Sequence, residues 1–390
     1  MPQRTPGVWT VVVPGAAAMA LAMGVGRFGF TPILPLMQDQ AGLAPEQGAK
    51  LATVNYLGYL LGAVLALVRP AVPSSVLAFR VGLVVQVATL AAMAATASVP
   101  AWALARLSSG VASAVVFIAV AGVVAVRLST GGARSGGWVY GGIGGGIALS
   151  GVLVLALERT GTWSTAWWAC AVAAAVLAAV AWILPVGGAP GPVRAPASRA
   201  GSGPPVRGRP GVRRSFVALV VSYLLEGAGY IIAGTFLVAA IRATSPGWIG
   251  SSAWVVVGLA ALPSSALYSR LASRFPPATV LRTALLVQAV GMLLPAVFSG
   301  SGVALFAGVV FGGTFLGIVS LGMGTGARMG VPRSAAILTI AFSIGQILGP
   351  LAAAPLLGGG YAPALVLGAV IVTLAAVPTL LIRSGRNATG

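Results

Sequence analysis

The stretch Ser222-Tyr-Leu-Leu-Glu-Gly-Ala-Gly-Tyr-Ile-Ile-Ala-Gly-Thr-Phe-Leu237 lies inside an apolar run that extends from Phe216 to Ile241. Such a run is long enough, as a helix, to cross the roughly 30 Å hydrocarbon core of a bilayer. Glu226 stands near its middle, where an ionisable side chain costs a few kcal/mol on insertion scales. An acid at that depth is by default a candidate functional residue.

The composition extends this interpretation to the whole chain. Of the 390 residues, 58% are hydrophobic and only 7% are charged, whereas soluble domains carry roughly a quarter charged residues. The chain has no histidine, which excludes histidine metal sites and histidine relays. Its one cysteine, Cys170, can form no disulfide within the chain. We therefore predict an all-α membrane protein without a metal or other cofactor.

Apolar runs of membrane-spanning length recur along the chain. They lie at about 9–36, 49–68, 77–96, 101–126, 137–157, 164–185, 216–241, 249–268, 279–298, 303–325, 334–356 and 362–382. The sequence therefore predicts twelve transmembrane helices.

The arginines of the connecting loops predict the orientation. The alternate loops that share a side with the N-terminus hold eighteen of the 23 basic residues: Arg4, Arg69, Arg80, Arg127, Arg134, Arg194, Arg199, Arg207, Arg209, Arg213, Arg214, Arg270, Arg274, Arg282, Arg328, Arg333, Arg383 and Arg386. The opposite loops hold Lys50, Arg159 and Arg242. Because cytoplasmic loops are enriched in Lys and Arg, we expect both termini in the cytoplasm. Of the 23 basic residues 22 are Arg, beside abundant Ala, Gly, Pro and Val, a composition that we interpret as that of a GC-rich bacterial genome, so the expected location is a bacterial inner membrane.

The chain divides near its middle. Residues 187–214 are rich in Pro, Gly, Ser and Arg, without an acid or an apolar period, which is typical of a flexible linker. We expect six-helix bundles at 1–186 and 215–390. Glycines repeat between them at an offset near 203, which aligns Gly142 with Gly345 and Gly110 with Gly313. Two such repeats around a central pathway are the architecture of a secondary transporter.

Several motifs resemble a known family. Gly26-Arg-Phe-Gly-Phe-Thr-Pro-Ile-Leu-Pro-Leu-Met37, Tyr223-Leu-Leu-Glu-Gly-Ala-Gly-Tyr230 and Gly345-Gln-Ile-Leu-Gly-Pro350 are similar to the YbfB/YjiJ-type branch of the major facilitator superfamily. The resemblance implies two pseudo-symmetric six-helix bundles and transport by alternating access. The superfamily's acidic loop motif is degraded after the second span, where Val68-Arg-Pro-Ala-Val-Pro-Ser-Ser75 has no acid.

Glu226 is the first candidate for the transport pathway. Tyr223, Glu226 and Tyr230 recur at i, i+3 and i+7, which places them on one helical face. Withdrawal from water favours the neutral form of a carboxyl and a nearby arginine favours its ionised form, so the sequence leaves its protonation open. The alternative is a structural carboxyl in an ion pair or at a helix break.

Two intramembrane arginines are the next candidates. Arg27, with Thr31 one turn away on the same face, lies in the first span one turn along from the position that the repeat matches to Glu226. The two charges could pair in one state and part in another, and both could contact substrate; alternatively, Arg27 reaches the outer surface. Arg106 lies in Arg-x-x-x-Gly110, which matches the superfamily's fourth-helix motif, and the resemblance implies a role in proton coupling. For Arg106 too, the alternative is a side chain that extends to the interface.

Asn55 and Tyr59 in the second span, and Gln346 in the eleventh, are polar groups in apolar surroundings. Each lines the pathway or joins neighbouring helices by a hydrogen bond, an interaction worth about 0.6–2 kcal/mol. The sequence does not choose between these roles.

We therefore expect a monomeric, proton-coupled secondary transporter. Two intramembrane arginines and one glutamate favour a small neutral or anionic substrate, such as a metabolite, drug or natural product, and superfamily analogy favours export. A lipid flippase or a facilitator without proton coupling is the alternative. An enzyme is not expected, because the chain has no histidine and no clustered acids. The expected partners are substrate, protons and membrane lipids. Nucleic acid is not among them, because the arginines are dispersed among short loops.

Overall fold

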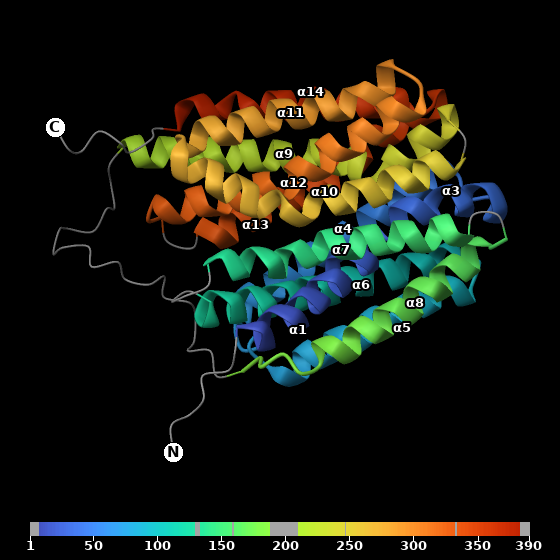
Figure 1. Ribbon diagram of the computed structural model, residues 1–390, viewed down its shortest axis with the longest axis horizontal. Helices are drawn as coiled ribbons and strands as arrows, with labels where there is room; N and C mark the ends of the chain where they lie inside the picture. The colour runs from blue at the N-terminus through green and yellow to red at the C-terminus, as the bar shows by residue number, and fades with distance from the viewer. Residues whose placement is uncertain are drawn as a thin grey trace.

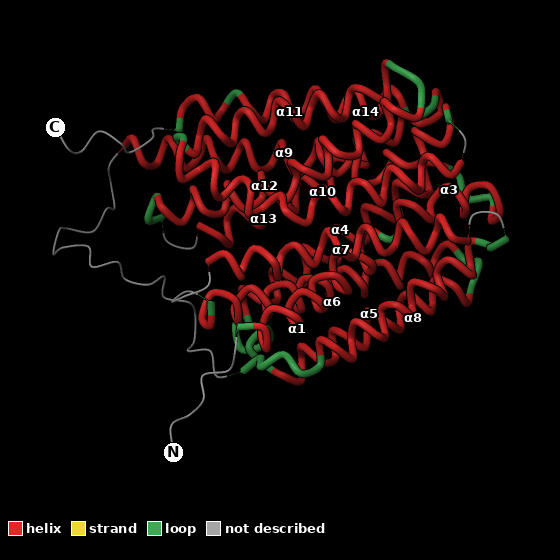
Figure 2. Tube along the Cα trace, viewed as in Figure 1, coloured by secondary structure: helices red, strands yellow, loops and turns green. Residues whose placement is uncertain are grey.

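The computed structural model describes residues 8–128, 133–157, 160–187, 210–245, 247–331 and 334–382. Within these ranges every regular element is a helix, with no strand (Figure 2). Twelve helical spans are long and apolar enough to cross a membrane, which confirms the predicted fold class.

The first six spans form one half of the molecule. The first is divided into α1 (Trp9–Met19), a π-helical segment (Ala20–Val25), α2 (Gly26–Phe28) and α3 (Phe30–Ala41). The other five are α4 (Pro45–Val68), α5 (Val76–Ala95), α6 (Val99–Arg127), α7 (Ala133–Leu157) and α8 (Trp163–Ala181).

The last six spans form the other half. They are α9 (Pro210–Thr244), α10 (Gly247–Arg274), α11 (Pro277–Val297), α12 (Ser301–Arg328), α13 (Ser334–Ala353) with a 3-10 turn at Ala354–Gly359, and α14 (Ala362–Ala376) with a 3-10 turn at Pro378–Leu381.

Local sequence signals explain several of the boundaries. α3 ends at Gly42, whose φ of 66° is in the left-handed region that glycine adopts without strain. The hydroxyl of Ser75 caps α5 by accepting from the N–H of Ala78 at 3.3 Å. Thr162 and Thr165 form a reciprocal capping box at the start of α8.

The spans occupy different depths in the bundle. In their most apolar windows, 78% of the residues are buried in the first span and 72% in the seventh, against 39% in the third and 33% in the sixth. The first and seventh spans are therefore central, and the third and sixth face the surroundings. The halves lie side by side and meet where α7 packs on α10, α4 on α13, and α3 on α9 (Figure 1).

Close helix contacts confirm the internal repeat. Gly142 and Gly146 of α7 pack so tightly on the first span that a Cβ at Gly142 would collide with the carbonyl of Ala16. Gly345, 203 residues after Gly142, packs in the same way on α9, where a Cβ would collide with the carbonyl of Leu224. Small residues permit such approaches in lipid, where packing rather than the hydrophobic effect holds helices together.

One predicted repeat pair needs a correction. The sequence aligns Gly110 with Gly313, yet a Cβ at Gly313 would meet nothing within 4 Å. Gly110 packs on the carbonyl of Asn55, and the matching contact in the other half is made by Gly312 on the carbonyl of Val257. The offset is therefore 202 at this helix, because the two halves differ in length before it.

The predicted linker falls largely outside the described residues, since 188–209 are not among them. The division into bundles at 1–186 and 215–390 joined by 187–214 stays a prediction in its exact bounds.

Candidate functional site

The site begins with a break in the first span. A π-helical segment at Ala20–Val25 is followed by only three α-helical residues before Gly29 interrupts the helix. Pro32 has no N–H to donate back along the chain. Such segments leave main-chain carbonyls without regular partners, so side chains from other helices can bind the backbone here.

Arg106 of α6 binds this irregular backbone. Its Nη1 donates to the carbonyl of Gly26 at 3.3 Å and its Nη2 to that of Arg27 at 3.4 Å. Its guanidinium also lies 4.7 Å from the centre of the Phe30 ring. The side chain is 2% exposed, so the alternative that it extends to the interface is wrong. Arg106 positions the part of the first span that carries Arg27.

Asn55 of α4 supports the same arrangement. Its Nδ2 donates to the carbonyl of Arg106 at 2.8 Å, which ties the second span to the fourth. The structure therefore places Asn55 in helix-to-helix contact, behind the arginine rather than beside it.

Arg27 is the central cation. It is 2% exposed, so the alternative in which it reaches the outer surface is wrong. Its Nη2 donates to Gln346 Oε1 at 2.6 Å, a charge-assisted hydrogen bond of a kind worth about 1.5–3 kcal/mol. The guanidinium also lies 4.4 Å from the ring centre of Tyr59 and 4.9 Å from that of Tyr56, distances at which cation–π attraction operates.

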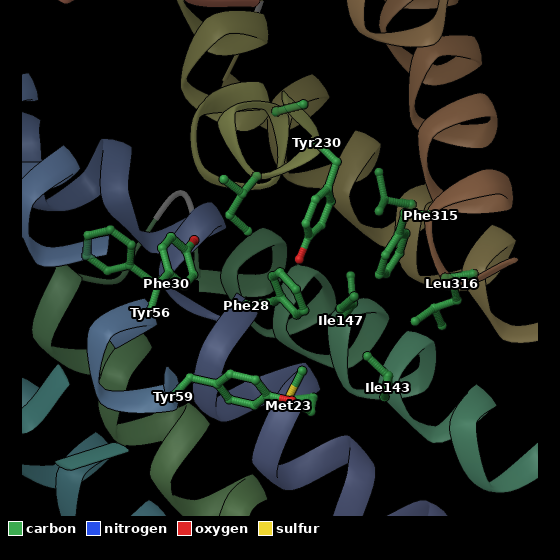
Figure 3. Packing of buried hydrophobic residues seen from close by; sticks show 14 of the residues in the cluster. Met23, Phe28, Phe30, Tyr56, Tyr59, Ile143, Ile147, Tyr230, Phe315 and Leu316 are labelled. Carbon is green, nitrogen blue, oxygen red and sulfur yellow. The ribbon is translucent and has the colours of Figure 1, made fainter. Parts of the chain in front are cut away.

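Gln346 connects Arg27 to the other half of the molecule. It lies on α13, and its amide Nε2 donates to the hydroxyl of Tyr230 on α9. The Tyr230 ring stacks on Phe315, with centroids 6.1 Å apart, and on Phe342, at 5.2 Å. Figure 3 shows Tyr230 and Phe315 converging with side chains of the first half. A continuous polar chain therefore crosses the centre of the protein.

Two further hydrogen bonds join the halves close to this chain. The hydroxyl of Thr31 donates to the carbonyl of Gly234, and these two positions are related by the 203-residue repeat. The Tyr56 hydroxyl lies 3.0 Å from Thr235 Oγ1. These hydrogen bonds join the first and second spans to the seventh.

The halves also meet at the end of the molecule that the arginine distribution predicts to be outside. Arg242 Nη2 lies 3.2 Å from Asp39 Oδ2 in an ion pair. The Tyr361 hydroxyl donates to Gln38 Oε1 at 2.8 Å. The polar contacts between the halves lie at the level of Arg27 or nearer to Asp39, so the halves are held closed at that end, while α7 and α10 also pack on the other side of that level, where a Cβ at Gly141 would approach the carbonyl of Leu262.

Glu226 does not pair with Arg27 in this state. It is 1% exposed, and its Oε1 accepts from Gln288 Nε2 of α11 at 2.8 Å. Its Oε2 and the Oε1 of Gln288 have no hydrogen-bond partner. Among the described residues the single ion pair is that of Asp39 with Arg242. The carboxyl is therefore enclosed in the second half, beside an amide rather than a cation.

The predicted candidates thus fall into two groups. Arg27, Thr31, Tyr59, Gln346 and Tyr230 come together at the boundary between the halves. Tyr223, by contrast, donates to the carbonyl of Val319 inside the second half. Although Tyr223, Glu226 and Tyr230 share a face of α9, their polar groups form hydrogen bonds with three different helices, α12, α11 and α13.

Sequence reasoning missed four polar residues of the site: Tyr56, Thr235, Gln86 and Gln288. The two glutamines carried a usable signal, because they are polar groups in apolar spans at a repeat spacing of 202. Gln86 donates to the carbonyls of Ala22 and Ser109, at 3.4 and 3.0 Å. The repeat thus places an amide against the broken first span in one half and against Glu226 in the other.

The chain can now be compared with known proteins. The family model described as "Uncharacterised MFS-type transporter YbfB" matches residues 19–380. The nucleoside transporter NupG, in the crystal structure of a point mutant, aligns with a TM-score of 0.70 and 14% identity over 94% of this chain and 98% of NupG. A bacterial homologue of the human lysosomal transporter Spinster, in an inward-facing and unoccupied crystal structure, aligns with a TM-score of 0.69 and 15% identity, and 98% of each chain is covered. No curated protein matches the chain in sequence.

Proposed function

Because this chain belongs to the YbfB family of MFS-type transporters, we propose that it is a proton-coupled secondary transporter that exports a small neutral or anionic molecule by alternating access. The observation that carries the coupling is the enclosure of Glu226, which is 1% exposed and bound to the Gln288 amide. The nearest titratable neighbours on α9 are tyrosines, one turn away on each side. A carboxyl in this setting holds a proton while closed off and exchanges it when its half opens to water.

Tyr230 links that proton to the substrate region. It lies one turn beyond Glu226 on α9 and accepts from Gln346, which itself accepts from Arg27. A change of charge at Glu226 therefore acts on the helix that carries Tyr230, the last member of the hydrogen-bonded series Arg27–Gln346–Tyr230. We propose that proton exchange at Glu226 shifts the equilibrium between forming and breaking these hydrogen bonds between the halves.

The substrate charge follows from the buried charges. Arg27 and Arg106 are both buried, and Glu226 is the one buried acid among the described residues. An excess of positive charge at bilayer depth favours a neutral or anionic substrate over a cation. Export is proposed by analogy with the superfamily alone. We also propose that the protein is a monomer in the bacterial inner membrane. The distribution of loop arginines supports the proposed orientation, in which both termini are cytoplasmic.

The test is a flux screen of small neutral and anionic compounds in proteoliposomes, with and without a pH gradient. For any transported compound, Glu226→Gln should abolish accumulation driven by the gradient and spare exchange of substrate for substrate. Glu46→Gln, a carboxyl-to-amide change in the first turn of α4, is the matched control and should leave both activities intact. Gradient-driven accumulation by Glu226→Gln would overturn the proton role. Transport restricted to lipophilic cations, unaffected by Arg27→Ala, would overturn the substrate class.

A further inference from the structure

Of the two buried arginines among the described residues, neither pairs with an acid, and Arg27 has the fewer hydrogen-bond acceptors. The two terminal nitrogens of Arg106 both bind main-chain carbonyls. Arg27 has five N–H donors to place, but among the described residues its guanidinium donates only to the neutral Oε1 of Gln346, and its Nε, like that of Arg106, has no hydrogen-bond partner. No acid lies within ion-pair distance of it in the described part of the chain. A buried cation in this condition is a binding site for an anion.

The groups around Arg27 are flat and apolar. The rings of Tyr59, Tyr56 and Phe28 lie 4.4, 4.9 and 5.7 Å from its guanidinium carbon. Tyr230, whose hydroxyl is joined to Arg27 through Gln346, presents another ring to the same region (Figure 3). Aromatic faces and edges attract other planar rings by stacking and edge-to-face contacts. The apolar part of a ligand here would therefore be bound best if it were planar.

We propose that Arg27, with the rings of Tyr56, Tyr59 and Tyr230, forms the binding site for an organic anion with a planar apolar body, of which an aromatic monocarboxylate is the simplest example. The inference rests on the proposed transport function and narrows its substrate. A carboxylate matches the planar guanidinium, with which it makes two parallel hydrogen bonds. One guanidinium with terminal N–H groups to spare suits a single negative charge.

Binding of such an anion has a consequence for the closed state. The carboxylate would take the Nη2 donor of Arg27 from Gln346, because a charged acceptor forms the stronger hydrogen bond. Gln346 is the partner through which Arg27 holds the second half of the molecule. Substrate and Gln346 therefore compete for Arg27, and binding removes one contact between the halves.

Equilibrium binding tests the proposal without a proton gradient. The full-length protein is purified in detergent, and its thermal unfolding is measured with benzoate, with benzamide, and with cyclohexanecarboxylate. A ligand that binds only the folded state raises the melting temperature in proportion to its occupancy. We expect stabilisation by benzoate, at least about tenfold weaker apparent binding of benzamide, which is neutral but of the same shape, and weaker binding of the non-planar cyclohexanecarboxylate.

Three variants complete the test. Arg27→Gln should lose the benzoate response, whereas Arg274→Gln, which removes an exposed arginine in the last turn of α10, should retain it. Gln346→Leu should bind benzoate more tightly than the unmodified protein, because it removes the competing acceptor; a purely structural Gln346 predicts the opposite. This variant decides the matter if Arg27→Gln does not fold.

Each of the other possible results would refute one part of the proposed anion site. Equal stabilisation by benzamide, or a benzoate response retained in Arg27→Gln, overturns the anion site. Equal binding of cyclohexanecarboxylate overturns the planar requirement, and no response to any of the three compounds overturns the proposal as a whole. Loss of gradient coupling in Glu226→Gln is measured separately in flux, so failure of the substrate class and failure of proton coupling are distinguishable.

Discussion

The ion pair between Asp39 and Arg242 provides a quantitative test of alternating access, because it joins the halves at the end that is closed. The two side chains are 61% and 24% exposed, and their charged atoms are 3.2 Å apart. Exposed ion pairs contribute only about 0.2–1 kcal/mol. Removing the pair with Asp39→Asn should therefore shift the equilibrium toward opening at this end by a factor of about 1.4–5.

Thiol labelling can measure that shift. Cys170 is buried and is the only cysteine of the chain, so background reaction should be low. Thr235 faces Tyr56 across the boundary between the halves and is 1% exposed, so a cysteine introduced at this position becomes reactive when the outer halves part. In a Thr235→Cys background, Asp39→Asn should accelerate labelling by a membrane-impermeant reagent about 1.4–5-fold.

Controls separate this effect from a general change of charge. Glu46→Gln removes an acid near the same end of the molecule, in the first turn of α4, and should leave the labelling rate unchanged. Raising the salt concentration from about 0.15 to 1 M should shrink the difference between Asp39→Asn and its parent, because the screening length falls from about 8 to 3 Å. Labelling that is unchanged or slower in Asp39→Asn would refute the assignment of this pair as a contact of the closed end.

Three further predictions concern stability, measured by thermal unfolding in detergent. Gly312→Ala should destabilise the protein, since its Cβ collides with backbone, while the neighbouring Gly313→Ala enters open space and should be neutral or stabilising by up to about 1 kcal/mol; similar losses at both would contradict the repeat geometry. Arg106→Met should cost about 1–3 kcal/mol, because the carbonyls of Gly26 and Arg27 each lose the donor that Arg106 supplies, and an unchanged melting temperature would contradict the positioning role. Gln288→Leu leaves the buried carboxyl of α9 without its donor and should cost a similar amount; a stabilising effect would show that the amide hydrogen bond is dispensable.

Much of the architecture could be predicted because the bilayer restricts the choices. A backbone in hydrocarbon must satisfy its own hydrogen bonds, so each long apolar run has to be a helix. The predicted run 49–68 therefore corresponds to α4 at Pro45–Val68, and 216–241 lies within α9 at Pro210–Thr244. The internal repeat could be predicted from the glycine positions for a related reason, since helices that approach closely in lipid need small residues at particular turns.

The candidate site was predicted only in part. Intramembrane charge singled out Arg27, Arg106 and Glu226, and the structure buries all three. Their partners could not be predicted, because hydrogen bonds such as Arg27 with Gln346 join residues 319 positions apart. Helical periodicity places side chains on a face but does not state which helix that face meets.

By itself, the sequence determined that the chain crosses a membrane twelve times, in two related halves, with costly charges in the first, fourth and seventh spans. The length of an apolar run and the spacing of small residues within a helix are local properties, so they can be recognised from residues that are close together in the sequence. The tertiary structure alone decided that Glu226 lies against Gln288, that Arg106 binds the backbone beside Arg27, and that Arg27 reaches Gln346 rather than an acid. Those pairings depend on how the two halves pack and on which end is closed, because a charge interacts with whatever the fold brings within a few ångströms, whatever the distance along the chain.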